Sequence, residues 1–195
     1  MIRWFVRVAF FALILFEIAN YVRVLHFTPN YTWFGLLVTS LVVFVGIECG
    51  AVILRRKARV TLPWAVWPLA LAVVALDAFG DIFHFYSRWS WYDQFGHFLG
   101  SLVTMVVIFS ALIAIERTHG WQHPRHVNPL LALGLSMTLA ILYEIEEYLE
   151  DYFGLSHRLG DGPDTANDLA MNLLGALTVV LVITFFRYAH RRHLR

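Results

Sequence analysis

The chain has 195 residues, of which 59% are hydrophobic and only 15% are charged. Soluble domains carry about 25% charged residues, so this composition excludes a soluble globular domain and indicates a membrane protein. The formal net charge is +1, and we expect no nucleic-acid partner. The single cysteine, Cys49, excludes an intrachain disulfide.

Apolar runs long enough to cross about 30 Å of hydrocarbon occur six times. We therefore predict an all-α integral membrane protein, a single transmembrane domain over residues 1–195 with six transmembrane helices in one bundle. The predicted helices are 4–22, 33–54, 64–84, 92–115, 130–150 and 165–186. A secretory signal peptide is the competing interpretation of the first run, but its apolar part is long and no A-x-A-like cleavage site follows, so we expect it to be kept.

The distribution of positive charge predicts the orientation. With a cytoplasmic amino terminus and six crossings, twelve of the fifteen Lys and Arg residues lie inside, among them the R-R-K-A-R block at 55–59. Only Arg23, Arg88 and Arg158 lie outside. Because cytoplasmic loops are enriched in Lys and Arg, we expect both termini in the cytoplasm of a multi-pass protein of the inner (plasma) membrane.

The acidic residues are distributed in the opposite way. Eleven of the fourteen carboxylates fall at the outer ends of the last four predicted helices or in the loops that join them. These are Asp77, Asp81, Asp93, Glu144, Glu146, Glu147, Glu150, Asp151, Asp161, Asp164 and Asp168. Ionisable groups at membrane depth are costly, so their gathering on four helices indicates a functional site.

Helical spacing predicts which of these side chains share a face. Asp77 and Asp81 are four residues apart, Asp81 and His84 three apart, and Asp93 and His97 again four apart. Near this last stripe, Gly96 and Gly100 form a neighbouring stripe of small residues. Such glycines favour the close approach of another helix, which would bring Asp93 and His97 to the centre of the bundle.

The last two helices add further acids. Glu144 and Glu147 share one face of the fifth predicted helix, whereas Asp164, Asp168 and Asn172 recur every four residues on the sixth. Carboxylates crowded in a medium of low dielectric constant must take up protons or hold a cation. Oxygen ligands with one or two imidazoles suit Mg²⁺, Mn²⁺, Ca²⁺, iron or zinc, and the pattern does not select one.

We therefore predict a divalent metal ion as cofactor. The predicted ligands are Asp81, His84, Asp93, His97, Glu147, Asp164 and Asp168. A spare carboxylate, Asp77 or Glu144, would act as general base.

Other residues have simpler explanations. Asp93 and Asp164 are also suited to capping their helices, and Glu17 and Glu48 can be proton carriers or neutral buried carboxyls. The acids expected to be solvated are Glu146, Glu150, Asp151 and Asp161. The aromatic residues expected at the membrane interface are Trp89, Trp91 and Tyr92. The histidines expected beside lipid headgroups are His119, His123 and His126.

Several of these motifs resemble those of the YjdF-like family of polytopic inner-membrane proteins. The motifs are D-x-x-x-D-x-x-H at 77–84, Y-D-x-x-x-H-F-x-G at 92–100, E-x-x-E at 144–147 and G-D-x-x-D-x-x-x-D at 160–168. The chain is more distantly similar to VanZ-like proteins, through Asp93 and His97 and through Asp168, Asn172 and Gly175. The resemblance implies a polytopic membrane fold and no particular reaction.

Three classes of function remain open from the sequence. The first is a metal-dependent membrane enzyme that acts on a lipid or lipid-linked substrate at the outer leaflet. The second is a proton- or cation-coupled transporter, for which a homo-oligomer would supply what one chain lacks. The third is a structural membrane protein in which the polar cluster fixes the register of the helices.

Overall fold

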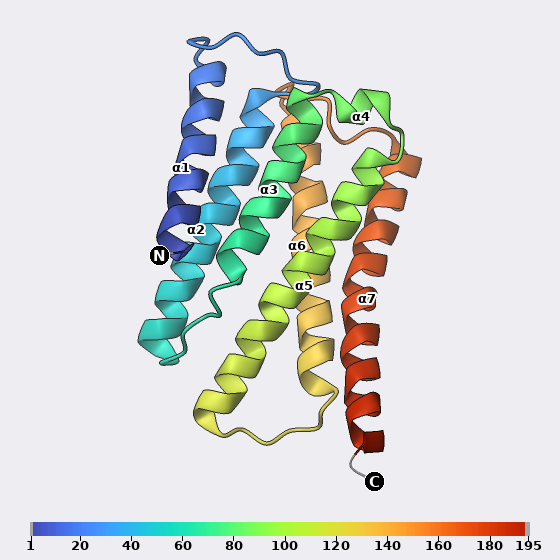
Figure 1. Cartoon of the computed structure of the whole chain (residues 1–195). Helices are drawn as coiled ribbons and strands as arrows, with labels where there is room; N and C mark the ends of the chain where they lie inside the picture. Colours follow the sequence, from blue (N-terminus) through green and yellow to red (C-terminus); the bar gives the residue numbers. More distant parts are fainter. Residues whose placement is uncertain (1, 194–195) are drawn as a thin grey trace.

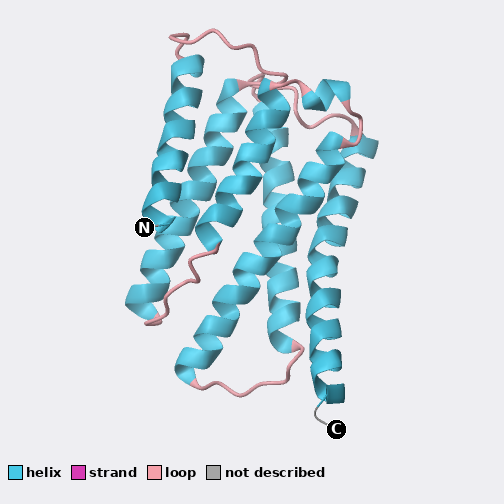
Figure 2. Cartoon of the chain, viewed as in Figure 1, coloured by secondary structure: helices cyan, strands magenta, loops and turns pink. Residues whose placement is uncertain are grey.

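The computed structural model describes residues 2–193, and these form seven helices and no strand (Figure 2). The helices are α1 (Ile2–Tyr21), α2 (Trp33–Lys57), α3 (Val66–Ile82), α4 (Phe85–Arg88), α5 (Tyr92–His119), α6 (Val127–Tyr152) and α7 (Gly162–His193). The predicted all-α class is therefore confirmed.

The long helices alternate in direction along the bundle (Figure 1). The carboxyl ends of α1, α3 and α6 and the amino ends of α2, α5 and α7 meet at one end, together with the short helix α4. We call this end the α4 end. The opposite end, which we call the basic end, holds residues 58–65 and 120–126, and α2 and α5 bring basic residues to it in their last turns.

Five helices are long and apolar enough to cross a membrane: α1, α2, α5, α6 and α7. The helix α3 has 17 residues, which corresponds to about 26 Å at 1.5 Å per residue. It ends at Ile82, earlier than predicted, because the chain turns there and His84 adopts a left-handed conformation with φ of 58°. Such a backbone conformation cannot continue a right-handed helix.

Two apolar clusters hold the bundle together. One joins α1 to α3 and the loop before it, through buried side chains such as Phe10, Trp67 and Val74. The other lies among α5, α6 and α7, around Met105 and Val179. The first predicted helix is therefore part of the packed bundle.

A close approach between α5 and α7 lies at Gly175 of α7. A Cβ atom there would collide with the backbone carbonyl of Phe98 on α5. We expected the close approach at Gly96 and Gly100, but a Cβ at either glycine would meet its nearest atom at 3.9 or 3.8 Å, an ordinary contact. The small residue that lets α5 and α7 come together is therefore on α7.

Candidate functional site

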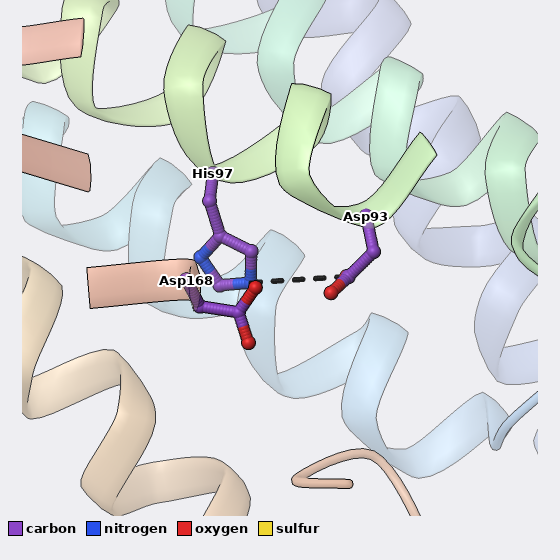
Figure 3. Close-up of side chains that lie close together, drawn as sticks. All are labelled: Asp93, His97 and Asp168. Atoms are coloured by element: carbon purple, nitrogen blue, oxygen red, sulfur yellow. Dashed lines mark ion pairs between the residues drawn. The ribbon is translucent and has the colours of Figure 1, made fainter. Parts of the chain in front are cut away.

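His97 lies at the centre of a cluster of acids near the α4 end. Its side chain is only 9% exposed, and its Nε2 atom lies 3.7 Å from Asp93 Oδ1, one turn away on α5. The same nitrogen lies 3.7 Å from Asp168 Oδ1, which α7 brings to it (Figure 3). Two helices thus aim two carboxylates at one imidazole nitrogen.

The other imidazole nitrogen faces α6 and the deeper part of α7. Glu144 Oε1 lies 3.6 Å from His97 Nδ1, and Asn172 Nδ2 lies 3.3 Å from it. The hydroxyl of Ser101 donates to Asn172 Oδ1 over 2.9 Å and holds this amide in place. Because the Asn172 oxygen accepts from Ser101, its amide N–H faces Nδ1, so in the neutral ring Nδ1 accepts and Nε2–H faces Asp93 and Asp168. A cation at Nε2 would require the ring proton to move to Nδ1.

Two groups of side chains present ligand atoms that all lie within 4.8 Å of one another. The first is Asp93, His97 and Asp168, and the second is His97, Glu144 and Glu147. In the second group Glu147 already has a cationic partner, because its Oε1 atom lies 3.1 Å from the guanidinium of Arg158. The first group is therefore the better candidate for a bound cation.

Arg158 is the buried cation of this end of the molecule. It comes from the loop between α6 and α7, and its side chain is 6% exposed. Besides Glu147, its nitrogens face Asp77 at 4.0 Å and Glu150 at 3.9 Å, and Nη2 donates a hydrogen bond to the hydroxyl of Tyr143. Burial opposes the charge of Arg158, but Tyr143, Asp77 and Glu147 outweigh it and raise its pKa well above the usual value.

The loop that carries Arg158 is held by one carboxylate. Asp151, at the end of α6, accepts hydrogen bonds from the backbone N–H groups of Arg158 and Leu159 at 3.0 and 3.1 Å, and from the hydroxyl of Ser156. On the other side, Gly35 of α2 leaves the space that the guanidinium fills, because a Cβ at Gly35 would collide with it. The loop is thus shaped to insert Arg158 among the acids.

The short helix α4 supplies the partner of Asp77. The hydroxyl of Tyr86 donates to Asp77 Oδ1 over 2.6 Å, and desolvation together with the charge of Asp77 raises the pKa of Tyr86 well above its usual value, so it stays a donor. Tyr92 packs beside it and donates to the Leu76 carbonyl over 2.7 Å. Gly80 leaves the space that both rings occupy.

Acids outnumber bases in this region. Six carboxylates surround two basic groups, Arg158 and His97. The six are Asp77, Asp93, Glu144, Glu147, Glu150 and Asp168. Within the described residues, Asp168 Oδ1 and both carboxylate oxygens of Glu144 are buried and have no hydrogen-bond partner. Such oxygens need a proton or a cation.

Three of the predicted ligands lie outside the cluster around His97. Asp81 is buried, but its carboxylate accepts the backbone N–H of Tyr31 over 2.6 Å, so it holds the loop between α1 and α2. His84 follows the end of α3, so the three-residue step from Asp81 does not continue on a helix. Asp164 is partly exposed in the first turn of α7, where its backbone N–H donates to Asp161 Oδ1.

Several other expectations need correction. Glu150 is 4% exposed, although we expected it to be solvated, because the loop after α6 folds back over it and brings Arg158 to 3.9 Å. Tyr92 is 5% exposed and packs inside, whereas Trp89 and Trp91 are exposed as expected of interfacial residues. Arg158, which we counted among the outside charges, lies within the protein.

Glu17 and Glu48, for which the sequence left open a proton carrier or a paired buried carboxyl, both have partners. Glu17 is buried and accepts a hydrogen bond of 2.8 Å from the hydroxyl of Ser40 on α2. Glu48 pairs with Arg7 through two bonds of 2.7 Å and accepts a third from the indole of Trp67. Both belong to the α1 to α3 half of the bundle, away from His97.

Sequence reasoning missed Arg158, Tyr143 and Tyr86 as parts of the site. For Arg158 a signal was present, since it lies between the acidic ends of the fifth and sixth predicted helices. Nothing in the spacing marks Tyr143 or Tyr86, because their roles depend on how the loop and α4 fold back onto the bundle.

Residues 2–190 match the family described as "Predicted membrane protein (DUF2238)". The chain belongs to this family. It is also 30% identical over 113 residues to the inner membrane protein YjdF of Escherichia coli K12, and this match covers 53% of the chain and 49% of that protein. No solved structure matches the chain.

These comparisons agree with the resemblance found in the sequence. The family match spans nearly the whole chain, and five helices can cross a membrane. The prediction of a multi-pass inner-membrane protein is therefore confirmed.

Proposed function

We propose that this family member binds a divalent cation between α5 and α7 and acts on a lipid or lipid-linked substrate at the outer face of the membrane. The ligands would be Asp93, His97 and Asp168. The observation that carries the proposal is the convergence of two carboxylate oxygens on His97 Nε2, each at 3.7 Å, with Asp168 Oδ1 buried and without a hydrogen-bond partner among the described residues.

The spacing of the donor atoms supports a shared ion. Distances of 3.7 Å are too long for hydrogen bonds. Ligands of one tetrahedral ion at about 2.1 Å from it lie about 3.4 Å from one another. Small shifts of the Asp93 and Asp168 side chains would therefore place both carboxylates and the imidazole around one cation.

Glu144 has a supporting position. A histidine that binds a metal through one nitrogen usually donates its other N–H to a carboxylate or carbonyl. Glu144 Oε1 stands 3.6 Å from His97 Nδ1, beyond hydrogen-bond range, and would have to move closer, with the Asn172 amide turned away, to accept that N–H when a cation binds Nε2. It is also the better of the two predicted general bases, because both its oxygens lack hydrogen-bond partners in the described structure, whereas Asp77 is bonded to Tyr86.

The proposal includes six crossings with both termini in the cytoplasm, α3 being the short sixth span. The positive charges in the last turns of α2 and α5 support a cytoplasmic location of the basic end. The site then lies near the outer surface, at the depth of phosphate headgroups. There a bound cation would neutralise the charge of a phosphate or activate water, and Glu144 would accept a proton.

The apolar clusters favour an enzyme over a transporter. Met105, Ala132, Ala176 and Val179 lie on the side of the site toward the basic end and are close-packed among α5, α6 and α7. A cation path would have to cross this apolar layer. In the proposed site, a substrate would reach the cation past Asp93, the most exposed of the three ligands at 30%.

Metal analysis tests the proposal. Purified protein, equilibrated with Mn²⁺ or Zn²⁺ and freed of excess ion, should retain about one equivalent, and Asp168→Asn should lose it. Asp161→Asn is the matched control, because Asp161 is an exposed acid near the same end and outside the group. Equal retention by the wild type and Asp168→Asn would refute the site.

Topology and transport need separate measurements. Single cysteines introduced at 155 and 122, in a Cys49→Ser background, should react with an impermeant reagent in intact cells at 155 and only after permeabilisation at 122.

Proteoliposomes should show no cation uptake. Uptake driven by a pH gradient would exclude the enzyme in favour of transport.

A further inference from the structure

A polar cavity lies at the basic end of the bundle, far from His97. It has a volume of about 270 Å³ and lies where α5 ends, α6 begins and the last turns of α7 pass by. The polar residues that line it are Glu116, Arg117, His123, Arg125, Asn128 and Arg187. We call this cavity the basic pocket. Its size is below the roughly 300 to 1,000 Å³ of sites for drug-sized ligands, so it suits a fragment such as a headgroup.

The charge of the basic pocket is positive. Three arginines line it against one carboxylate, Glu116. The Glu116 carboxylate already has a hydrogen-bond partner, because the side chain of Asn128 donates to it. Asn128 Oδ1 in turn lies 2.9 Å from His123 Nε2. Glu116 therefore orients Asn128 and His123, and the three guanidinium groups remain to bind an anion.

One of the three arginines is held in place before any ligand arrives. Arg187 Nη1 donates to the backbone carbonyl of Arg125 over 2.7 Å, and its guanidinium lies 5.9 Å from the centre of the Phe109 ring. These contacts use one of its five N–H groups and fix the plane of the others. Arg117 and Arg125 are exposed at the rim and can close on an anion from the solvent side.

The surroundings of the pocket indicate the kind of anion. Phe185 and Phe186, directly before Arg187, are 66% and 67% exposed, and Leu130, two residues after Asn128, is 58% exposed. In a membrane these side chains face acyl chains. Basic pockets between transmembrane helices at the cytoplasmic side are typical sites for lipid headgroups.

We infer that the basic pocket binds the phosphate headgroup of an anionic phospholipid, with its acyl chains along the exposed apolar faces of α6 and α7. This site is separate from the cluster around His97, and the inference does not depend on a metal there. A free phosphate ion has the same charge chemistry but would make no use of the neighbouring apolar side chains.

Native mass spectrometry of the full chain tests the inference. Protein reconstituted with equal amounts of phosphatidylglycerol and phosphatidylcholine, then extracted in mild detergent, should retain phosphatidylglycerol preferentially. Arg187→Gln and Arg117→Gln should each lower this preference about fivefold, since one basic residue near a lipid surface contributes about 1 kcal/mol. The Arg117 side chain makes no hydrogen bond or ion pair among the described residues, so its variant reports binding even if Arg187→Gln folds poorly.

Arg56→Gln is the matched control, because Arg56 is an exposed arginine at the same end and outside the pocket. It should retain the wild-type preference. Equal retention of both lipids by the wild type, or an equal loss in Arg56→Gln, would overturn the inference. Displacement of the retained lipid by inorganic phosphate would show that the pocket takes the free ion, which also overturns it.

Discussion

The two halves of the bundle treat charge differently. In the α1 to α3 half, Arg7 and Glu48 form a one-to-one pair with two bonds of 2.7 Å, and Trp67 satisfies the carboxylate further. In the α5 to α7 half, five carboxylates share Arg158 and His97 with Asp77 of α3, and several buried oxygens lack partners in the described structure.

The difference separates a structural pair from a candidate site. A structural ion pair is balanced, since each uncompensated charge would cost stability. The excess of acid around His97 and Arg158 has no such explanation, unless a cation or protons join it. Buried carboxylates in excess of their partners are therefore the feature that marks the site.

The largest expected effect comes from removing the buried arginine. Arg158→Ala would leave Glu147, Asp77 and Glu150 without their cation and should lower the free energy of unfolding by about 3 to 5 kcal/mol. Unfolding in mixed SDS micelles measures it. Arg88→Ala, at an exposed arginine of the same end, should have little effect. If the loss comes from uncompensated charge, Arg158→Ala with Glu147→Gln should be more stable than Arg158→Ala alone.

The next effect concerns the cation itself. A ligand that binds only the folded state at a hundred times its dissociation constant stabilises that state by about 2.7 kcal/mol. Added Mn²⁺ or Zn²⁺ should therefore raise the melting temperature of the wild type and leave that of Asp168→Asn unchanged. Affinity should fall as the pH is lowered, because protons compete with the cation for His97 and the carboxylates. An equal rise in both proteins would place the bound cation elsewhere.

The contact between α5 and α7 can be broken at one glycine. In Gly175→Ala the new methyl group would meet the backbone of Phe98, which cannot move aside as a side chain would, and the cost should be about 1 to 3 kcal/mol. The change should also weaken cation binding, because it moves Asp168 away from His97. Gly134→Ala on α6 is the control, since no atom lies within 4 Å of its new Cβ. Equal stability of the two variants would contradict the close approach.

The smallest effect is expected at the balanced pair. Arg7→Met removes the partner of Glu48, but the side chains are 40% and 25% exposed and Glu48 keeps the hydrogen bond from the Trp67 indole. The loss should be about 1 kcal/mol or less. The free energies of unfolding of Arg7→Met and Arg158→Ala, measured in the same SDS micelles, show whether the two halves differ as proposed. A loss at Arg7 equal to that at Arg158 would remove the distinction between them.

Much of the site follows from helical spacing alone. The four-residue step places Asp93 beside His97, and the alternation of directions brings the amino ends of α5 and α7 to the carboxyl end of α6. Predictions from helical spacing were wrong where the residues lie beyond the end of a helix. His84 was predicted from a step of three that the chain does not take, because α3 ends at Ile82.

The sequence by itself determined that this is an all-helical membrane protein and that its acids gather near one end, because apolar run length and charge distribution are properties of the chain alone. Only the tertiary structure decided which acids have partners. Arg158 reaches Glu147 because a loop folds back, and Asp168 reaches His97 because Gly175 lets two helices touch. Both contacts join residues from different segments, and no local pattern specifies the distance between them.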